Sequence, residues 1–491
     1  MSDRSSSGPT PAFEPGETCW RVERADRAGF LVDNEACFAA IAEALRSATR
    51  SIWILGWAFD PRTRLAPDGR EGPDDPDEIG RLLIELAAVR PELDIRILVW
   101  RSALGINGFQ GLRGHRARRA FAGSRVRFRE ASDVPFGASH HQKLVVIDDR
   151  LAFCGGGDFV TNRWDTTGHF HADGRRLLPE RRPHPPRHEV TMIVEGPVAS
   201  ALGDLFGERW RNAGGDSPPR PTDAVGALWP VSARIDMSAA DVAIARTQPA
   251  WRDRPLVDEI RRLTLRCIRR ARRTIYLENQ YFTCANVAAA LAGRLGEADG
   301  PEVVLIAPRH SPNWFDRLTM DHARNPLIRR LRAADLHGRF RALAPRTSGG
   351  APIIVHSKVG IFDDEIVRIG SANLNNRSEG FDTECELAVE ARTAVDRRKI
   401  GAFRDALLAH YLDVPTDRFE QAVAHAGGII GAIDRLNLSE RLAPLPHGPA
   451  TLWEKVVSAH DLGDPRDARQ SWRLRWRDPA FPDLPGKPGP P

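Results

Sequence analysis

Residues 141–148 are HQKLVVID, and residues 356–363 are HSKVGIFD. Both octapeptides have the pattern HxKxxxxD, and each follows the third of three short β-branched, apolar stretches in its half of the chain. For this composition, one chance match is expected with a frequency on the order of 0.01. Two matches at equivalent places therefore indicate a duplication, and the remaining sequence is interpreted around it.

The sequence on either side of the motifs repeats as well. Residues 50–55, RSIWIL, recur as residues 273–277, RTIYL, and residues 95–99, IRILV, resemble residues 303–306, VVLI. A period slightly above about 200 residues is too long for a solenoid unit and is typical of a duplicated domain. Each half has the pattern helix, strand, helix, strand, helix, strand, motif, which favours α/β architecture with a largely buried sheet. We expect two duplicated α/β sandwich lobes, each a mixed sheet flanked by helices.

Stretches rich in proline, glycine and serine predict the boundaries of these lobes. Residues 175–187 are expected to form a surface loop, and GGDSPPRP at residues 214–221 suggests a connection between lobes. The predicted organisation is a disordered N-terminus over 1–12, a first lobe over 13–213, an interlobe linker over 214–250, a second lobe over 251–415, and a C-terminal helical extension with a disordered tail over 416–491.

Composition limits the class of protein. The 491 residues are 42% hydrophobic and 27% charged, as in a soluble folded protein, and the net charge of +5 suits an anionic partner without selecting phospholipid or nucleic acid. The six cysteines form no CxxC pair, which argues against a disulfide framework and a zinc cluster. No signal-peptide core or apolar stretch of about 20 residues is present in the sequence. We expect a cytoplasmic or peripheral membrane location, with secretion without a classical signal peptide as the alternative.

The motif residues are suited to contact one ligand. In a strand, positions i and i+2 project from the same face, so His141 can act with Lys143, and His356 with Lys358. Asp148 and Asp363 complete the two predicted catalytic sets. Their place beyond the strand favours a role in fixing the loop.

A glycine turn and an acidic residue follow each motif. Gly156, Ser371 and Asn373 are candidate substrate-binding residues, because small residues let backbone N–H groups approach an anion and the two side chains add donors. Glu189 and Glu384 are expected at the start of the next strands, and both are candidate catalytic residues. The alternative is that each forms a surface salt bridge.

This inventory fits the cleavage of a phosphodiester. A histidine whose second ring nitrogen is held by a carboxylate can attack phosphorus, and a second histidine can protonate the leaving oxygen. Two lysines stabilise the charge of the transition state. An ammonium beside a cation would be repelled, so we expect neither a metal nor another cofactor.

The paired motifs with their glycine turns resemble the phospholipase D superfamily over roughly residues 15–440. Features such as Tyr276-Leu277-Glu278-Asn279-Gln280 are similar to the bacterial and eukaryotic-type phosphatidylcholine-hydrolysing branch. The resemblance implies a monomer with one active site at the lobe interface and a phosphohistidine intermediate that water or an alcohol resolves. It also implies that His141 is the nucleophile and His356 the general acid and base, an order that the internal symmetry leaves open.

We therefore expect a phospholipase D that acts at a phospholipid membrane surface, with phosphatidylcholine as the substrate and no nucleic-acid partner. Transfer of the phosphatidyl group to an alcohol is a possible second outcome of the same intermediate. The alternatives are a cardiolipin-synthase-like phosphatidyltransferase, a nuclease, and a non-enzymatic lipid-binding module.

Overall fold

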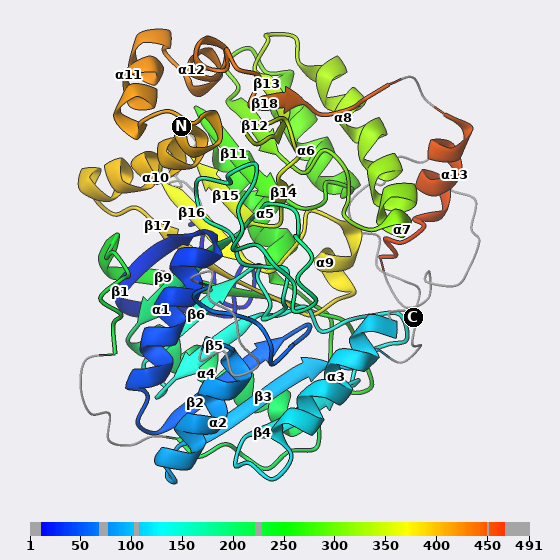
Figure 1. Cartoon of the computed structure of the whole chain (residues 1–491). Coiled ribbons are helices and arrows are strands. Elements are labelled where there is room, and N and C mark those ends of the chain that lie inside the picture. Colours follow the sequence, from blue (N-terminus) through cyan, green and yellow to red (C-terminus); the bar gives the residue numbers. More distant parts are fainter. Residues whose placement is uncertain (1–10, 68–76, 103–107, 221–227, 449–450, 467–491) are drawn as a thin grey trace, which may run out of the picture.

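The computed structural model describes residues 11–67, 77–102, 108–220, 228–448 and 451–466. Within these ranges, sixteen strands form one mixed sheet that runs through the molecule, with helices packed against it (Figure 1). The α/β prediction is confirmed. The two halves differ from the expectation in sharing one continuous sheet.

The first half supplies seven strands of this sheet, in the order β1-β8-β6-β5-β2-β3-β4. Its strands are β1 (Arg21–Val32), β2 (Ser51–Gly56), β3 (Asp94–Trp100), β4 (Arg127–Ala131), β5 (Leu144–Ile147), β6 (Leu151–Gly155) and β8 (Val190–Glu195). Its helices are α1 (Asp33–Ser47), α2 (Ile79–Val89), α3 (Gly108–Phe121) and α4 (Pro197–Asn212). The parallel pairs β2–β3 and β3–β4 are joined through α2 and α3, as crossover connections require.

The second half repeats the order as β9-β17-β16-β15-β11-β12-β13, and β18 is added at its edge. Its strands are β9 (Met237–Gln248), β11 (Thr274–Asn279), β12 (Glu302–Ile306), β13 (Phe340–Pro345), β15 (Lys358–Phe362), β16 (Ile366–Gly370), β17 (Glu384–Glu390) and β18 (Leu442–Pro444). Its helices are α5 (Glu259–Arg270), α6 (Ala285–Leu295), α7 (Trp314–Asp316), the π-helix η1 (Arg317–Asp321), α8 (His322–Ala334), α9 (Asn376–Gly380) and α10 (Ala394–Leu412). The alternation predicted for the two halves is therefore present in both.

The expected interlobe linker over 214–250 is wrong for its last part. Residues 237–248 form β9, a twelve-residue strand that pairs antiparallel with both β1 and β17. β1 and β9 are equivalent first strands of the two repeats, and their pairing fuses the two sheets. The proline-rich stretch that suggested a linker covers only residues that precede β9. The short strand β10 (Val257–Asp258) pairs antiparallel with the last two residues of β9.

The region after residue 415 packs onto the second half. α11 (Thr416–Ala426) and α12 (Ile429–Leu436) lie beside α10, and β18 joins the sheet next to β13. α13 (Leu452–His460) packs against α8. The helical extension predicted here is present. The disordered ends predicted at 1–12 and in the tail fall largely outside the described residues, although Ala12 is fully buried.

Apolar packing holds the two halves together. One buried cluster on one face of the sheet takes residues from strands of both repeats and from α4, α10, α11 and α12. Each half also has its own cluster, under α1 and α2 in the first and under α5, α6 and α8 in the second. Within the described ranges, no helix has the length and hydrophobicity needed to cross a membrane.

Candidate active site

The two motifs meet where the halves face each other. His141 and Lys143 immediately precede β5, and His356 lies between β14 (Ile354–Val355) and β15. The histidines therefore sit at the entrance of the strand and not within it, which corrects the strand placement that we expected. Both histidines lie before the first residues of β5 and β15, which are inner strands of the sheet.

Each motif is anchored by backbone from the opposite half. The His141 N–H donates to the Thr383 carbonyl at 2.9 Å, and the His356 N–H donates to the His188 carbonyl, also at 2.9 Å. The short strand β7 (Arg187–His188) runs parallel to β14 to make the second contact. In each case the accepting residue directly precedes one of the two predicted glutamates.

The histidine and glutamate pairs consequently cross between the halves. His141 Nδ1 lies 3.0 Å from both carboxylate oxygens of Glu384, and His356 Nδ1 lies 2.9 Å from Glu189 Oε1. The glutamates are buried, whereas the His141 side chain keeps 16% of its exposure. Since Nδ1 donates to the carboxylate, Nε2 of each ring carries the lone pair that faces a substrate. The surface salt bridge considered for these glutamates is excluded by their burial.

Two serine hydroxyls hold Glu384. Ser371 Oγ donates to Glu384 Oε2 at 2.5 Å, and Ser378 Oγ donates to Glu384 Oε1 at 2.6 Å. Ser371 was predicted to bind substrate, but its hydroxyl is directed at the catalytic carboxylate instead. Ser378, from α9, was missed because nothing in its local sequence distinguishes it.

The other predicted anion ligands differ from each other. A Cβ on Gly156 would lie 2.7 Å from the His356 carbonyl and 3.1 Å from Lys358 Cδ, so this glycine is needed for the second motif to approach. Asn373 is buried, and its Oδ1 has no hydrogen-bond partner among the described residues. Asn373 therefore keeps a polar group available, whereas Gly156 serves the packing of the two motifs.

The lysines lie beside the histidines. Lys143 Nζ donates to the His141 carbonyl at 2.7 Å and lies 3.5 Å from Asp158 Oδ2. Lys358 Nζ donates to the His356 carbonyl at 2.6 Å and lies 3.4 Å from Gln280 Oε1. These contacts fix both ammonium groups at the site.

Burial alters the ionisation of these groups. Desolvation, together with the nearby lysines, lowers the pKa of His141 and of His356 well below the usual value. Burial raises the pKa of Glu384 to about 7 and lowers the pKa of Lys358 to about 7. Both rings are therefore neutral at neutral pH in the free site, which suits a nucleophile.

The motif aspartates lie away from this chemistry. Asp148 accepts hydrogen bonds from the N–H groups of Thr49, Arg50 and Ser51, and Asp363 accepts from the three equivalent N–H groups of 272–274. Both are at the far end of their strand from the histidine, in tight turns with positive φ. These contacts are those of residues that fix a loop, the role that their sequence position favoured, and they do not support a place for either aspartate in the catalytic set.

Two arginines at the site were not predicted. Arg163 Nε and Arg187 Nη1 lie 4.0 and 3.9 Å from Glu189 Oε1, and both nitrogens are buried without a hydrogen-bond partner. Arg163 Nη1 donates to Asn162 Oδ1 at 3.2 Å, so only part of that guanidinium group lacks a hydrogen bond. The nitrogens without a partner, beside Glu189, could receive the oxygens of an anion. Both arginines belong to stretches that resemble the phosphatidylcholine-hydrolysing branch, Arg163-Trp164-Asp165 and Arg187-His188-Glu189, but the sequence alone did not distinguish a site residue from a packing residue there.

Comparisons with known proteins agree with this geometry. A phospholipase D family model matches residues 44–288, and a model described as cardiolipin synthase, PLD-like domain, matches residues 264–399. Together the two matches include both motifs and all four paired histidine and glutamate residues. The chain belongs to the phospholipase D superfamily.

Curated phospholipases D are distant relatives within the superfamily. The chain is 25% identical to phospholipase D A of Dictyostelium discoideum over 74% of its own length and 33% of that protein. It is also 25% identical to phospholipase D alpha 2 of Oryza sativa subsp. japonica, over 78% of its length and 64% of the rice protein. The chain thus spans between a third and two thirds of these relatives.

Among solved structures, a phosphatidylserine synthase of Haemophilus influenzae superposes with a TM-score of 0.57 at 13% identity. The match covers 86% of this chain and 95% of the synthase. At this identity, the likeness shows that the superfamily fold is shared.

Proposed function

We propose that this protein is a phospholipase D, which hydrolyses the distal phosphodiester bond of a glycerophospholipid to phosphatidic acid and a free alcohol. The observation that carries the proposal is the pair of crossed histidine and glutamate contacts, His141 with Glu384 and His356 with Glu189. Two oriented imidazoles at one site are what a two-step displacement at phosphorus requires. Phosphatidylcholine is the proposed substrate because of the resemblance to that branch.

In the first step, His141 Nε2 attacks phosphorus and forms a phosphohistidine. The P–O bond to the head-group alcohol breaks, and the departing oxygen takes a proton from Nε2 of His356. His356 is neutral in the free site, so it has to gain a proton on Nε2 before this step. The phosphate anion of the bound substrate favours this protonated form, because a negative charge beside the ring raises its pKa. Lys143 and Lys358 stabilise the added negative charge.

In the second step, His356 takes a proton from water, and the resulting hydroxide attacks phosphorus. The P–N bond breaks, which releases phosphatidic acid and restores neutral His141. An alcohol in place of water yields a phosphatidyl alcohol by the same path. Both motifs come from one chain, so we propose that a monomer is active.

An exposed apolar surface supports a phospholipid membrane as the partner. Trp314 is 73% exposed and Phe315 51% exposed on α7, and Trp453 of α13 donates its indole N–H to the Leu318 carbonyl beside them. The Tyr281 hydroxyl links this surface to the site, because it donates to Asp316 at 2.7 Å. Tyr281 directly follows Gln280, which contacts Lys358. Exposed tryptophan and phenylalanine suit the bilayer interface better than the paths of aromatic and basic residues that bind single-stranded nucleic acid.

Product analysis tests the proposal. Purified full-length protein is incubated with phosphatidylcholine vesicles and ethanol and, in parallel, with single-stranded DNA. We expect phosphatidic acid together with some phosphatidylethanol, and intact DNA. Formation of phosphatidyl transfer products alone would favour a phosphatidyltransferase. Degraded DNA without a lipid product would overturn the proposed substrate class.

A further inference from the structure

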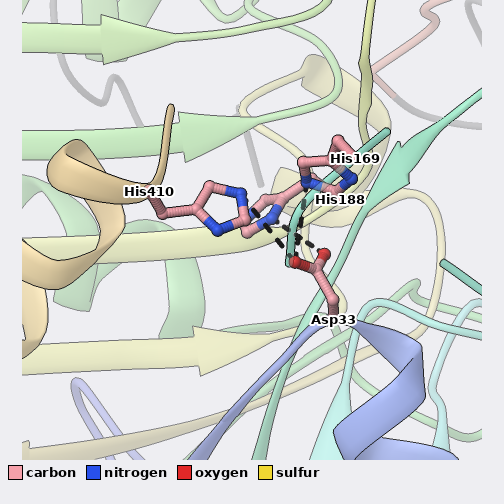
Figure 2. Close-up of side chains that lie close together, drawn as sticks. All are labelled: Asp33, His169, His188 and His410. Atoms are coloured by element: carbon pink, nitrogen blue, oxygen red, sulfur yellow. Dashed lines mark ion pairs between the residues drawn. The ribbon is translucent and has the colours of Figure 1, made fainter. Parts of the chain in front are cut away.

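A second group of titratable side chains lies near the catalytic site. Asp33, His169, His188 and His410 each direct one ligand-type atom into a common space, and these four atoms lie within 4.8 Å of one another (Figure 2). They come from four segments: the start of α1, the loop before β7, β7 itself, and α10. The motifs do not include them, and the catalytic steps above do not use them.

Three of the inward atoms are buried and have no hydrogen-bond partner among the described residues: Asp33 Oδ2, His169 Nε2 and His410 Nε2. The fourth, His188 Nδ1, is also buried, and its near neighbour is Asp33 Oδ1 at 2.9 Å. Asp33 and His188 are fully buried, and His169 is 2% exposed. Buried polar atoms without a partner destabilise a fold, so a group that satisfies them is expected at such a place. A single ion at their centre would satisfy all of them.

The distances between these atoms suit a small divalent cation. Asp33 Oδ2 lies 3.5 Å from His169 Nε2 and 3.8 Å from His410 Nε2, and Asp33 Oδ1 lies 2.9 Å from His188 Nδ1. Ligands at about 2.0–2.2 Å from a tetrahedral zinc ion are separated from each other by about 3.4 Å. The two distances from Asp33 Oδ2 lie close to this value, and all four ligand-type atoms lie within 4.8 Å of one another.

The outer hydrogen bonds have the form found at metal centres. His169 Nδ1 contacts Asp165 Oδ2 at 2.9 Å, and His188 Nε2 contacts Glu278 Oε2 at 3.0 Å. A carboxylate on the second ring nitrogen fixes the tautomer and turns the other nitrogen, as a lone-pair donor, toward the metal. Both of these histidines therefore have a ligand atom and a supporting carboxylate.

The charges around the four side chains also favour a bound cation. Asp33, Asp165 and Glu278 carry three negative charges, and Arg176 pairs with Asp165. Three negative charges and one positive charge leave −2 when the imidazoles are neutral, which a divalent cation balances. Without an ion, an imidazolium at His188 between Asp33 and Glu278 would still leave His169 Nε2 and His410 Nε2 unpaired. The chemistry therefore favours a metal over a single proton.

We propose that Asp33, His169, His188 and His410 form a structural site for a zinc-class divalent metal ion. Three imidazoles and one carboxylate, in a closed and buried arrangement, match the ligands that Zn²⁺ prefers. The sequence predicted no metal, because its argument considered the cysteines and the motif lysines. The tertiary structure assembles this site from residues that are widely separated in the chain.

The site would hold one side of the catalytic centre in place. The Asp33 N–H donates to the Glu189 carbonyl at 2.8 Å, and the Glu189 N–H donates to Asp33 Oδ1 at 3.1 Å. His188 also accepts the backbone N–H of His356. An ion bound here ties α10 of the second half to β7, which directly precedes Glu189. Asp33 and His188 are thus positioning residues for His356.

Metal analysis of the full-length protein tests the site. Elemental analysis after gel filtration is expected to find about one zinc per chain, as in a closed structural site. His169→Gln and His410→Gln are expected to lose the metal. His425→Gln is the matched control, because His425 is an exposed histidine on α11 and should leave the content unchanged.

A second measurement uses wild-type protein, so it tests the site even if the variants fail to fold. Wild-type protein is stripped with a strong chelator, and Tm is recorded before and after Zn²⁺ alone is added back. We expect a loss of several degrees that Zn²⁺ restores, because an ion that binds only the folded state stabilises it. Co²⁺ in the stripped protein should give the absorption bands of tetrahedral cobalt. Absence of stoichiometric metal, an unchanged Tm and no cobalt bands would overturn the proposal. None of these measurements depends on the lipid substrate, so the site and the proposed function can fail separately.

Discussion

At the scale of single residues, the chemistry rests on two imidazoles that are oriented by glutamates. Glu384 and Glu189 accept from Nδ1 and leave Nε2 of each ring for phosphorus and for the leaving oxygen. In the proposed mechanism the two rings act in sequence on one phosphate, so neither can replace the other.

Replacement of either histidine should therefore abolish turnover. We expect His141→Asn and His356→Asn each to lower kcat by at least about 10³-fold, with unchanged Tm and circular dichroism. His425→Asn is the control and should keep full activity. A near wild-type rate in either motif variant would contradict a shared site.

The pH dependence should report Glu384. Burial raises the pKa of this carboxyl to about 7, while Lys143 and the hydroxyls of Ser371 and Ser378 lower it in part. The ionised form accepts the His141 Nδ1–H, so activity should fall as the pH drops below this pKa. Ser371→Ala removes a donor to the charged form, so the acid limb of kcat/KM should move up by roughly one pH unit.

Ser200→Ala serves as the control for this profile. Its hydroxyl donates to Asp149 at 3.1 Å, outside the site, so it should leave the acid limb in place. A Ser371→Ala profile that matches wild type would show that Glu384 does not set the limb.

At the scale of elements, each motif belongs to a β-hairpin. The hairpins depend on tight turns at one end and on close packing between the two halves at the other. Asp148 and Asp363 occupy left-handed turns and tie each hairpin to the preceding helix–strand connection. At the other end of the hairpin, the turn after β6 lies against the second motif without room for a Cβ at Gly156. The HxKxxxxD pattern thus combines catalytic residues at one end of a strand with a structural residue at the other.

Gly156→Ala tests this contact between the halves. The added methyl would overlap the His356 carbonyl, so the second motif must move, and we expect kcat to fall by at least about tenfold, since small misplacements at a site are costly. Gly174→Ala is matched to it, because a Cβ there meets no atom within 4 Å. The two variants are compared by kcat on the same vesicles. Equal rates would show that the hairpin tolerates the shift.

At the scale of the whole molecule, the continuous sheet makes one unit of two repeats. β1 and β9 pair along most of their length, and each catalytic histidine depends on a glutamate from the other half. α7 and α13, which carry the exposed Trp314, Phe315 and Trp453, lie on the outside of the second half; Figure 1 shows the position of the two helices. Tyr281 and Asp316 connect this surface to the region of Lys358.

The membrane surface should be tested with vesicles. We expect Trp314→Ser with Phe315→Ser to reduce binding to phosphatidylcholine vesicles by at least about tenfold, since each aromatic side chain contributes on the order of 2 kcal/mol on burial. Sedimentation with vesicles measures this binding.

Leu438→Ser is the control for the vesicle experiment, because Leu438 is 86% exposed and lies apart from α7 and α13 in the sequence. It should bind like wild type. Equal binding by the aromatic double variant would place the lipid contact elsewhere.

The sequence by itself determined the duplication and the α/β class, and it predicted the histidines, lysines and glutamates that the structure brings together at the candidate site. These depend on local patterns: HxKxxxxD is contiguous, and the alternation of helices and strands is visible in hydrophobic periodicity. The sequence also indicated, from the position of Asp148 and Asp363, that these residues fix loops. The sequence did not reveal β9, the first strand of the second repeat. This strand follows a proline-rich stretch that resembles a linker, so its residues were assigned to the linker.

Only the tertiary structure decided which residues act on which. The crossing of His141 to Glu384 and of His356 to Glu189 follows from the pairing of β1 with β9 and of β7 with β14, which brings together residues that no local periodicity relates. The same is true of Arg163, Arg187 and Ser378, and of the cluster around Asp33. The physical reason is that hydrogen bonds and burial act across space, so they depend on contacts that form only when both halves have folded against each other.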